Sequence, residues 1–171
     1  MPVKVEIKMD VQSMSDFMVY HIFSSTAGMM AVALGALNAG FVVSFIIRGN
    51  LALALLFFAF VIVIAVGFPY LIRRKVQKQM ENSPKLSAPV TYEFDEGGVT
   101  TTTQDDSGKA SWGKFKKIFS HKNLIIFYDE SKRAIVLPVQ QLGDDYTAVV
   151  DMIYAHVPSK AVKIRRIDGK G

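Results

Sequence analysis

The chain begins with a strict alternation of apolar and polar residues. Residues 3–12, VKVEIKMDVQ, place valine, isoleucine and methionine at every second position, with charged or amide side chains between them. This period of two is typical of a β-strand that has one buried and one solvated face. A single strand is not stable alone, so residues 1–12 are predicted to pair with strands from elsewhere in the chain.

Two apolar runs follow this strand. Residues 26–47 and 51–72 contain no charged side chain. Each run exceeds the ~20 residues that a transmembrane helix needs. Only Arg48, Gly49 and Asn50 separate the runs, so residues 13–75 are predicted to form a tight membrane hairpin with spans at about 26–47 and 51–72. A cleaved signal peptide is the alternative for the first run, and the long, partly acidic segment before it argues against that alternative.

The ends of the hairpin leave two interpretations open. Residues 14–25 carry aromatic side chains suited to the membrane interface and form either an interfacial approach or, as we favour, the first turns of a long first helix. Ser13 and Asp16 resemble a capping box at its start. Pro69 is expected to kink the second span.

One face of the first span carries small residues. Ala36, Gly40 and Ser44 recur every four positions, a spacing that lets another helix approach closely. The partner is either the second span, which is the default, or a second copy of the chain.

Charge predicts the orientation of the hairpin. Residues 1–72 hold three basic and three acidic side chains, residues 73–87 hold five and one, and residues 88–171 hold twelve and eleven, which sums to the net +5 of the chain. Lysine and arginine keep a flanking segment cytoplasmic. We therefore expect a multi-pass protein of the cell (inner) membrane with both termini in the cytoplasm. Within this region Arg73, Arg74 and Lys75 are candidate contacts to lipid headgroups, and residues 76–87 form a basic juxtamembrane linker.

Beyond the linker the pattern changes to short strands separated by turns. The predicted strands are residues 90–94, 99–103, 110–120, 124–129 and 134–139, with turns at 95–98 and 104–109. A helix over 146–157 follows, with Asp144 as its N-cap, and residues 159–171 are expected to be a frayed basic tail. The predicted fold for residues 88–158 is a small α+β or all-β domain: a curled antiparallel barrel, capped by the last helix and completed by the N-terminal strand.

Candidate chemistry is sparse. The chain has no cysteine, and its three histidines are not spaced as metal ligands. No nucleophile elbow and no phosphate-binding glycine loop is present in the sequence. We therefore expect no enzymatic activity, no metal, no cofactor and no small-molecule substrate.

The most suggestive stretch for binding is WGKFKKIFSHK, residues 112–122, in which basic and aromatic residues interleave. A surface of this kind binds anionic headgroups, acidic peptides or nucleic acid. The near-neutral charge of residues 88–171 argues against nucleic acid. The structural alternative is that the aromatic residues fill the core and the lysines guard a sheet edge. The candidate surface is Trp112, Lys114, Phe115, Lys116, Lys117 and Lys122.

Several short motifs resemble one protein family. Two adjacent spans, Thr91-Tyr92-Glu93-Phe94 before an acidic glycine turn, Trp112 before a lysine-bearing strand, and an Ile-Val-Leu-Pro stop at 135–138 are similar to YcxB-like membrane proteins. The resemblance implies a cytoplasmic pleckstrin-homology-like (PH-like) domain tethered to a bacterial membrane by a helical hairpin. It implies no activity.

Three functions are compatible with these patterns. The first is a docking or assembly module that binds a protein segment by strand addition at a sheet edge or at residues 112–122. The second is a sensor of anionic lipid that uses the basic–aromatic stretch and Arg73, Arg74 and Lys75. The third is a structural subunit of a larger membrane complex, or a homo-oligomer, assembled through Ala36, Gly40 and Ser44. The expected partners are therefore the lipid bilayer and another protein chain.

Overall fold

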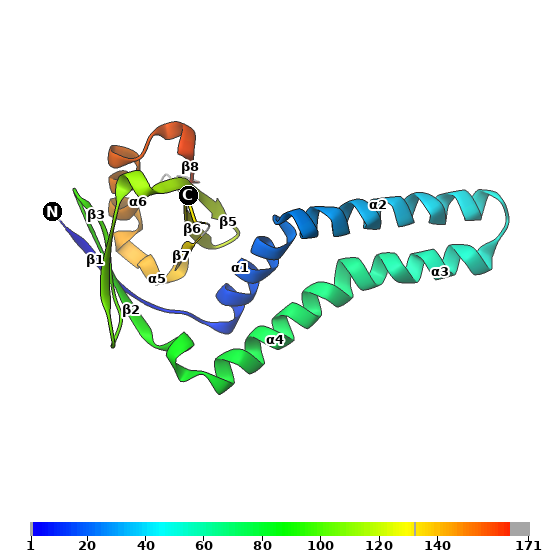
Figure 1. The fold of residues 1–171 in the computed structure, drawn as a ribbon, viewed down its shortest axis with the longest axis horizontal. Coiled ribbons are helices and arrows are strands. Elements are labelled where there is room, and N and C mark those ends of the chain that lie inside the picture. Colours follow the sequence, from blue (N-terminus) through cyan, green and yellow to red (C-terminus); the bar gives the residue numbers. More distant parts are fainter. Residues whose placement is uncertain (1, 132, 165–171) are drawn as a thin grey trace. The chain divides into compact units, whose positions relative to one another are not determined.

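A computed structural model describes residues 2–131 and 133–164 of the chain. The described residues divide into two compact units, one within Met1–Ser13 and Ser83–Gly171 and the other comprising Met14–Asn82. The first unit contains the strands and the second is helical (Figure 1).

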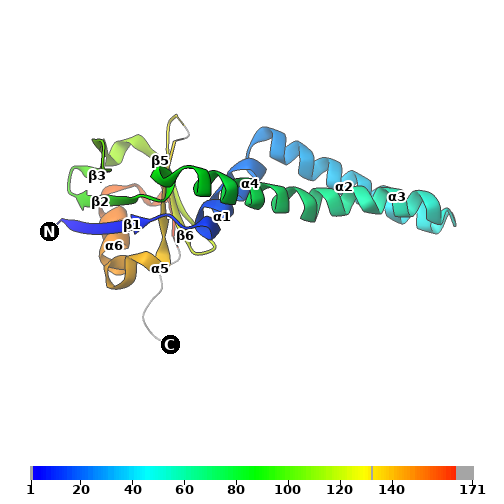
Figure 2. The ribbon, with the colours of Figure 1, turned by 90° about the horizontal axis from the view of Figure 1, so that it is seen from below.

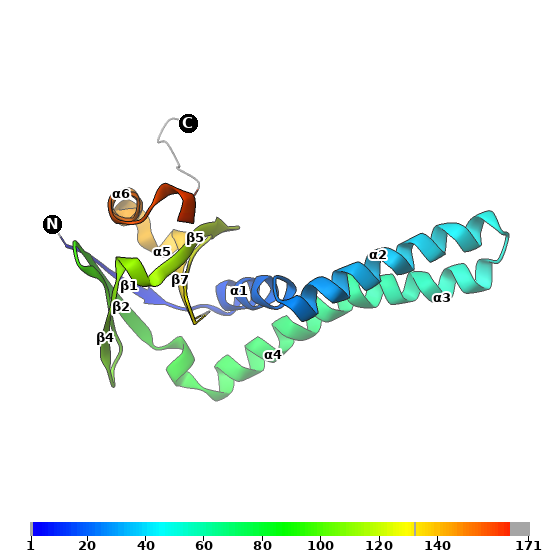
Figure 3. The same cartoon turned by 45° about the horizontal axis from the view of Figure 1, so that its top comes forward.

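The helical unit is built from four α-helices. They are α1 (Val11–Phe23), α2 (Thr26–Ile47), α3 (Leu51–Ile62) and α4 (Phe68–Asn82). Helices α2 and α3 run side by side (Figures 1 and 3), and Phe57 of α3 packs between Phe41 and Phe45 of α2 at ring-centroid distances of 5.1 and 5.5 Å. The two helices Thr26–Ile47 and Leu51–Asn82 are long and apolar enough to cross a membrane, judged by length and composition.

The favoured single long first helix is wrong, because α1 and α2 are separate helices. The Ser25 side chain accepts a hydrogen bond from the Gly28 N–H and so caps a new helix that begins at Thr26. At the corner the chain folds so tightly that a Cβ on Gly28 would overlap the Ile22 carbonyl. Capping chemistry and a glycine therefore create a break that uniform apolarity does not reveal.

Helix α1 packs on α4 instead. Ile72, Val76 and Met80 lie on one face of α4 and contact the apolar side chains of α1. An ion pair of 3.5 Å between Arg73 and Asp16 links the same two helices. Asp16 thus pairs with α4, and the Ser13–Asp16 capping box is not observed. The side chain next to the start of α1 is Asp10, whose Oδ1 accepts from the Ser13 N–H at 2.8 Å.

A π-helical turn at Val63–Gly67 joins α3 to α4, directly before Pro69. Proline has no N–H and its ring displaces the carbonyl one turn earlier, and a π-turn accommodates both effects. The helix changes direction at this turn, where the sequence predicts a kink (Figure 1). Helix α4 ends at Asn82, two residues before Pro84, as expected for a helix that meets proline.

The N-terminal strand β1 (Val3–Lys8) pairs antiparallel with β2 (Pro89–Asp95). Its apolar positions Val5 and Ile7 are buried. The prediction that the strand extends to Gln12 is wrong, since the strand ends at Lys8 and α1 begins at Val11. The Asp10 cap explains the difference, because it satisfies the first helical N–H groups and so favours a helix over continued alternation.

The strands form two four-stranded sheets. Sheet A has the order β1-β2-β3-β4, and sheet B has the order β7-β6-β5-β8. The remaining strands are β3 (Gly98–Thr102), β4 (Ser107–Ser111), β5 (Phe115–His121), β6 (Leu124–Asp129), β7 (Ala134–Pro138) and β8 (Val162–Lys163). Neighbouring strands are antiparallel except for β5 and β8, which are parallel. No pairing joins β1 to β8 or β4 to β7 among the described residues, so the predicted closed barrel is not formed.

The predicted strand over residues 110–120 is wrong in one respect. A 3₁₀ turn at Trp112–Lys114 divides it into β4, which belongs to sheet A, and β5, which belongs to sheet B. Strand β4 also begins at Ser107, inside the stretch predicted as a turn. The turn at Trp112 is where the chain passes from one sheet to the other, so a continuous strand is impossible there.

Helices α5 (Val139–Leu142) and α6 (Tyr146–His156) complete this unit, and Figure 2 shows them from another side. Val149, Val150 and Ile153 of α6 join one core with residues of both sheets, including Phe94 and Phe127. Asp144 is not the N-cap of α6; it lies in a 3₁₀ turn, Gly143–Asp145, that leads into the helix.

The expectation of a frayed tail is wrong for residues 159–164. A 3₁₀ turn at Ser159–Ala161 leads to β8, and Val162 and Ile164 are buried in the core. Two apolar side chains at alternate positions add a short strand to sheet B. Residues 165–171, the rest of the predicted tail, lie outside the described part.

Candidate binding cleft between strands β4 and β7

The predicted basic–aromatic surface divides into buried rings and exposed lysines. Trp112 and Phe115 are each 6% exposed and belong to the core. The Trp112 Nε1–H donates to the Asp95 carbonyl at 2.8 Å, and its ring stacks on His156 with centroids 5.5 Å apart. The aromatic residues are therefore core residues, as the structural alternative predicted, and offer no ring surface for stacking.

The lysines of the same stretch do not share one site. A bulge in β5 between Phe115 and Lys117 places Lys116 and Lys117 next to each other on the exposed side. Lys116 pairs with Glu130 at 2.8 Å, and the Lys117 ammonium lies 4.5 Å from the centre of the Phe119 ring. Lys122 has a positive φ of 50° in the turn between β5 and β6. Lys114 lines a cleft.

The cleft lies between the two sheets and has a volume of about 300 Å³. Sheet A contributes Gly108, Lys109 and Ala110 of β4, and sheet B contributes the start of β7 and the end of β6. The lining residues are Thr101, Gly108, Lys109, Ala110, Lys114, Phe115, Asp129, Arg133, Ala134 and Ile135. This is the place where pairing of β4 with β7 would have closed a barrel.

The backbone of β4 has no strand partner on the side that faces the cleft, among the described residues. Strand β4 pairs with β3 alone among the described residues. The hairpin closes with the Thr103 N–H bonded to the Asp106 carbonyl, and antiparallel pairs then alternate between bonded and non-bonded along the strands. This alternation directs the N–H and C=O of Ser107, Lys109 and Ser111 to the outer edge.

Strand β7 has a free edge for the same reason. It pairs with β6 alone among the described residues. The Asp129 N–H donates to the Arg133 carbonyl at 3.1 Å, so the following pair, Tyr128 with Ala134, is non-bonded. The Ala134 backbone therefore points outward at the cleft, opposite β4.

Elsewhere in sheet A the edge is partly occupied. At the end of β1, the Lys8 N–H donates to the Gln141 side-chain oxygen and the Gln141 amide donates to the Lys8 carbonyl, both at 2.8 Å. The Gln141 side chain of α5 thereby satisfies the backbone groups that a neighbouring strand would otherwise pair with. On the outer edge of β4 the Asp106 carboxylate accepts from the Ser107 N–H at 2.8 Å, whereas the outward backbone groups of Lys109 have no such side-chain partner among the described residues.

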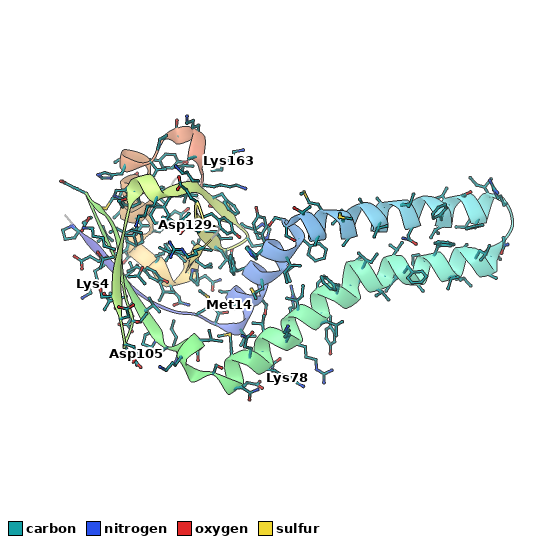
Figure 4. All side chains as sticks on the ribbon, viewed as in Figure 1. Lys4, Met14, Lys78, Asp105, Asp129 and Lys163 are labelled. Atoms are coloured by element: carbon teal, nitrogen blue, oxygen red, sulfur yellow. The ribbon has the colours of Figure 1, made fainter. Side chains whose placement is uncertain are left out.

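Charge around the cleft is positive. Lys109, Lys114 and Arg133 contribute three cations against the Asp129 carboxylate. Arg133 Nε contacts Asp129 at 2.8 Å, and Asp129 is labelled in Figure 4. Burial acts to raise the pKa of Asp129, but hydrogen bonds and charge from Arg133 outweigh burial and lower that pKa.

Lys109 contacts Asp95 at 2.6 Å at the β2–β3 turn. The hydrogen bond from Lys109 lowers the pKa of Asp95, burial opposes that change, and N–H groups of Gly97 and Gly98 add to it. Two of the three cations are thus held in place by carboxylates. Lys114 makes no ion pair with a described residue.

The candidate lipid contacts lie on α4 of the helical unit. Arg73 is paired with Asp16, whereas Arg74 and Lys75 are exposed. Lys78, labelled in Figure 4, is exposed one turn further along the helix. Arg74, Lys75 and Lys78 therefore lie outside the face of α4 that packs on α1, whereas Arg73 contacts α1 through Asp16.

The small-residue seam of Ala36, Gly40 and Ser44 does not pack on α3 along its whole length, since only Ser44 is half-buried. Ala36 and Gly40 are exposed, and a Cβ placed on Gly40 would meet no atom within 4 Å. Helix α3 packs on the face of α2 where Phe41 and Phe45 lie.

Metal chemistry has no support from the described residues. In residues 2–131 and 133–164, no group of three or more histidine, aspartate or glutamate side chains is placed to hold a metal ion.

Comparison with known proteins identifies part of the strand-rich unit. Residues 94–153 match the family model described as YcxB-like protein. This YcxB-like segment runs from Phe94 in β2 to Ile153 in α6 and includes every residue that lines the cleft. The match confirms the predicted resemblance to this family for residues 94–153, whereas β1, the helical hairpin and β8 lie outside it. No curated protein and no solved structure matches the chain.

Sequence reasoning missed most of the cleft in the YcxB-like segment. It singled out Lys114 and Phe115 but not Lys109, Asp129 or Arg133. A signal was present in SGKAS, residues 107–111, where small and polar residues show little hydrophobic alternation. A strand with such small side chains can bind a partner mainly through its backbone groups. Only the arrangement of the two sheets shows which edge of the strand is unpaired.

Proposed function

We propose that this protein is a non-enzymatic docking module anchored in a membrane. Its helical hairpin crosses the inner membrane twice, and its strand-rich unit is a PH-like domain in the cytoplasm that binds a protein segment. The segment adds as a strand to the edge of β4 in the cleft between β4 and β7.

The observation that carries the proposal is the pair of free strand edges that face one cleft. Natural proteins cover, twist or charge exposed edges, because an open edge pairs with other chains. Here Lys109 and Ala134 present unpaired backbone groups from the two sides of a cleft of about 300 Å³. A strand added between β4 and β7 would form hydrogen bonds with the backbone groups of both edges.

The membrane anchor is supported by the exposure of apolar side chains in the helical unit. Ile47 is 80% exposed and Leu55 is 68% exposed, in helices of sufficient length to span a bilayer. Large apolar surfaces on a chain indicate contact with lipid or protein. The net charge of +4 in residues 73–87, five basic minus one acidic, supports a cytoplasmic position for that segment.

Site-directed photocrosslinking tests the docking site. The chain has no cysteine, so one introduced cysteine carries the only label. Gly108→Cys is sterically permitted, since a Cβ there meets nothing within 4 Å. We expect a crosslinker on Cys at 108 to capture a protein in native membranes. The same label on Ser159→Cys, an exposed position outside the cleft, should not capture that protein.

A matched pair of variants tests strand addition. Lys109→Gln removes the charge and keeps the outward N–H, whereas Lys109→Pro removes both, and proline is tolerated where an edge N–H faces solvent. Capture through Cys at 108 should fall further in Lys109→Pro than in Lys109→Gln. Equal capture in the two variants, or equal capture at 108 and 159, would contradict docking at this edge.

Reporter fusions at the two ends of the chain test the anchor. If the hairpin crosses twice, reporters at Met1 and Gly171 are active on the same side of the membrane, the cytoplasm. Opposite sides would refute the proposed topology.

A lipid-sensing role is the second candidate, and the exposed Arg74, Lys75 and Lys78 of α4 favour it. Each basic residue near an anionic surface contributes about 1 kcal/mol. Replacing Arg74 and Lys75 by glutamine should then lower the share of anionic lipid that co-purifies, measured by mass spectrometry. An unchanged lipid share would argue against sensing by this face.

A structural-subunit role is the third candidate, favoured by the exposed Ala36 and Gly40. Gly40→Leu should reduce the size of the complex in mild detergent if this face packs on another helix. Ala39→Leu, at an exposed position outside the Ala36, Gly40 and Ser44 series, is the matched control. Unchanged size in Gly40→Leu would exclude assembly through the seam.

A further inference from the structure

The cleft between β4 and β7 is selective in charge as well as in shape. Its rim carries Lys109, Lys114 and Arg133, and its single carboxylate, Asp129, is already engaged by Arg133. Lys109 is engaged by Asp95. Lys114 is left as an exposed cation with no ion pair to a described residue. An occupant with a negative charge opposite Lys114 complements this surface, and a basic occupant meets repulsion.

The backbone around the cleft distinguishes a peptide from a phosphate group. A phosphate accepts hydrogen bonds only, so it is favoured where donors converge. The outward groups of Lys109 and Ala134 alternate N–H with C=O, as at any free strand edge. Carbonyl oxygens repel an anion but accept from the amides of an extended chain. The edges therefore favour a polypeptide over a headgroup or a free phosphate.

The inner wall of the cleft adds a third requirement. Ala110, Phe115 and Ile135 line it, and Phe115 and Ala110 connect it to the core. Successive side chains of a strand point to opposite faces. A bound strand would thus direct every second side chain to this apolar wall and the others toward the charged rim.

Resting on the docking function proposed above, we propose that the partner is an extended acidic segment in which carboxylate and apolar side chains alternate. Its backbone pairs with the free edge of β4, its apolar side chains cover Ala110, Phe115 and Ile135, and a carboxylate lies opposite Lys114. Arg133 stays paired with Asp129 and Lys109 with Asp95, and both cations contribute to the positive electrostatic potential of the cleft.

Four synthetic nonapeptides provide the test, with the full chain in a neutral detergent. The first alternates glutamate and valine, the second replaces glutamate by glutamine, and the third replaces it by lysine. The fourth is the glutamate peptide with alternate amides N-methylated along one edge, which blocks strand pairing and keeps the charge. Each peptide carries a fluorescent label, and binding is measured by anisotropy.

We expect the glutamate peptide to bind about twofold to fivefold more tightly than the glutamine peptide, the range expected for one favourable exposed charge pair. The lysine peptide and the N-methylated peptide should bind more weakly than the glutamine peptide. The preference for glutamate should fall as salt rises, since exposed charges are screened.

Two variants locate the charge preference. Lys114→Gln should abolish the preference for glutamate over glutamine and leave binding of the glutamine peptide unchanged. Lys160→Gln removes an equally exposed lysine outside the cleft and should change neither affinity. Because binding of the glutamine peptide reports the fold of the cleft, weaker binding of the glutamate peptide alone cannot be attributed to misfolding.

The outcomes separate this inference from the docking proposal. Equal binding of the glutamate and glutamine peptides, with weak binding of the N-methylated one, overturns the acidic preference and leaves docking by strand addition intact. If no peptide binds and Cys at 108 captures no protein, both proposals fail. If anionic phosphatidylglycerol vesicles, but no peptide, protect Lys114 from chemical labelling, the cleft is a lipid site and the acidic segment is excluded.

Discussion

The two units of this chain use the same apolar side chains in opposite ways. In the strand-rich unit Phe94, Ile118 and Phe127 are fully buried, at 0% exposure. In the helical unit Phe58 and Phe60 are 50% and 51% exposed, and Leu55 is 68% exposed. Strand β1 alternates apolar and polar residues and turns of polar residues separate the other strands, whereas α2 and α3 are apolar on every side.

This difference shows that the two units are suited to different solvents. A helix with apolar residues around its whole circumference suits a protein interior or a bilayer, and α2 and α3 have few neighbours to cover them within their unit. In the strand-rich unit the apolar side chains are buried against other side chains of the same unit. In the helical unit the proposed bilayer covers the apolar side chains. The same substitution should therefore change the stability of the two units by different amounts.

The largest predicted effect contrasts two phenylalanines. Phe127 lies 5.3 Å from Phe115 and 6.3 Å from Phe94 between ring centroids. Phe127→Ala should lower the free energy of unfolding by about 3–5 kcal/mol, because it leaves a cavity in a packed core. Thermal unfolding followed by the fluorescence of Trp112, the sole tryptophan and a core residue, measures this effect.

Phe60→Ala is the matched control in the helical unit. Its half-exposed ring contributes little to packing within the unit, so the Trp112 transition should stay unchanged in detergent. A loss as large as that of Phe127→Ala would contradict the distinction between the two units.

A smaller effect is expected where the helical unit is tightly packed. Gly28→Ala places a methyl group against the Ile22 carbonyl and the Phe23 backbone, so the α1–α2 corner must open. We expect a loss of about 1–3 kcal/mol, typical of overpacking. Thermal loss of the helical circular-dichroism signal is the measurement. Gly40→Ala, whose added methyl group meets nothing within 4 Å, should have the melting temperature of the parent chain. A similar fall in melting temperature in both variants would contradict tight packing at the α1–α2 corner.

A third prediction concerns the start of α1. Asp10→Ala removes two acceptors: Oδ1, which accepts from the Ser13 N–H at 2.8 Å, and Oδ2, which accepts from the Ser13 Oγ–H at 2.7 Å. Loss of an N-cap costs about 1 kcal/mol. Asp10→Asn keeps one acceptor oxygen and should restore most of that stability, as read by chemical denaturation. Equal losses in the two variants would show that charge, rather than capping, is what matters.

The smallest effect is a pH dependence that belongs to the strand-rich unit. The folded pKa values of Asp95 and Asp129 lie below their ordinary value, through contacts with Lys109 and Arg133. A carboxyl whose folded pKa is lowered stabilises the fold above its ordinary pKa of about 3.9, and that contribution is lost as pH falls through the folded pKa.

Asp95→Asn should therefore lower stability at pH 7 and weaken the acid dependence below about pH 4. Acid titration of the Trp112 fluorescence measures both, because the Trp112 indole donates to the Asp95 carbonyl. Glu96→Gln, in the same turn, serves as the exposed control. An acid transition of unchanged steepness in Asp95→Asn would rule out this carboxyl as a contributor.

Particular residues show how far sequence reasoning reached. Alternation correctly indicated a strand at the N-terminus, and the acidic glycine turn at Asp95 correctly indicated a hairpin, because both signals are local. The same reasoning joined β4 to β5 across Trp112, since no proline and no cluster of turn residues marks the place where the chain changes sheets. It also extended β1 to Gln12, because it counted Asp10 as a polar strand position rather than a cap.

The candidate site was harder to predict for a physical reason. Lys114 and Phe115 are neighbours in sequence and were recognised together, but Arg133 and Lys109 reach the cleft from separate strands. Unpaired backbone N–H and C=O groups at a sheet edge cannot be recognised from the types of the side chains. Its detection requires knowledge of which strands pair and which do not.

The sequence by itself determined the kind of each segment: two helices long and apolar enough for a membrane, a set of short strands, a closing helix and a resemblance to YcxB-like proteins. Local chemistry suffices for these features, since periodicity, capping and turn residues act within a few positions. Only the tertiary structure decided that the two sheets stay unjoined and that β4 and β7 leave a cleft, because pairing between distant strands depends on the packing of the whole core.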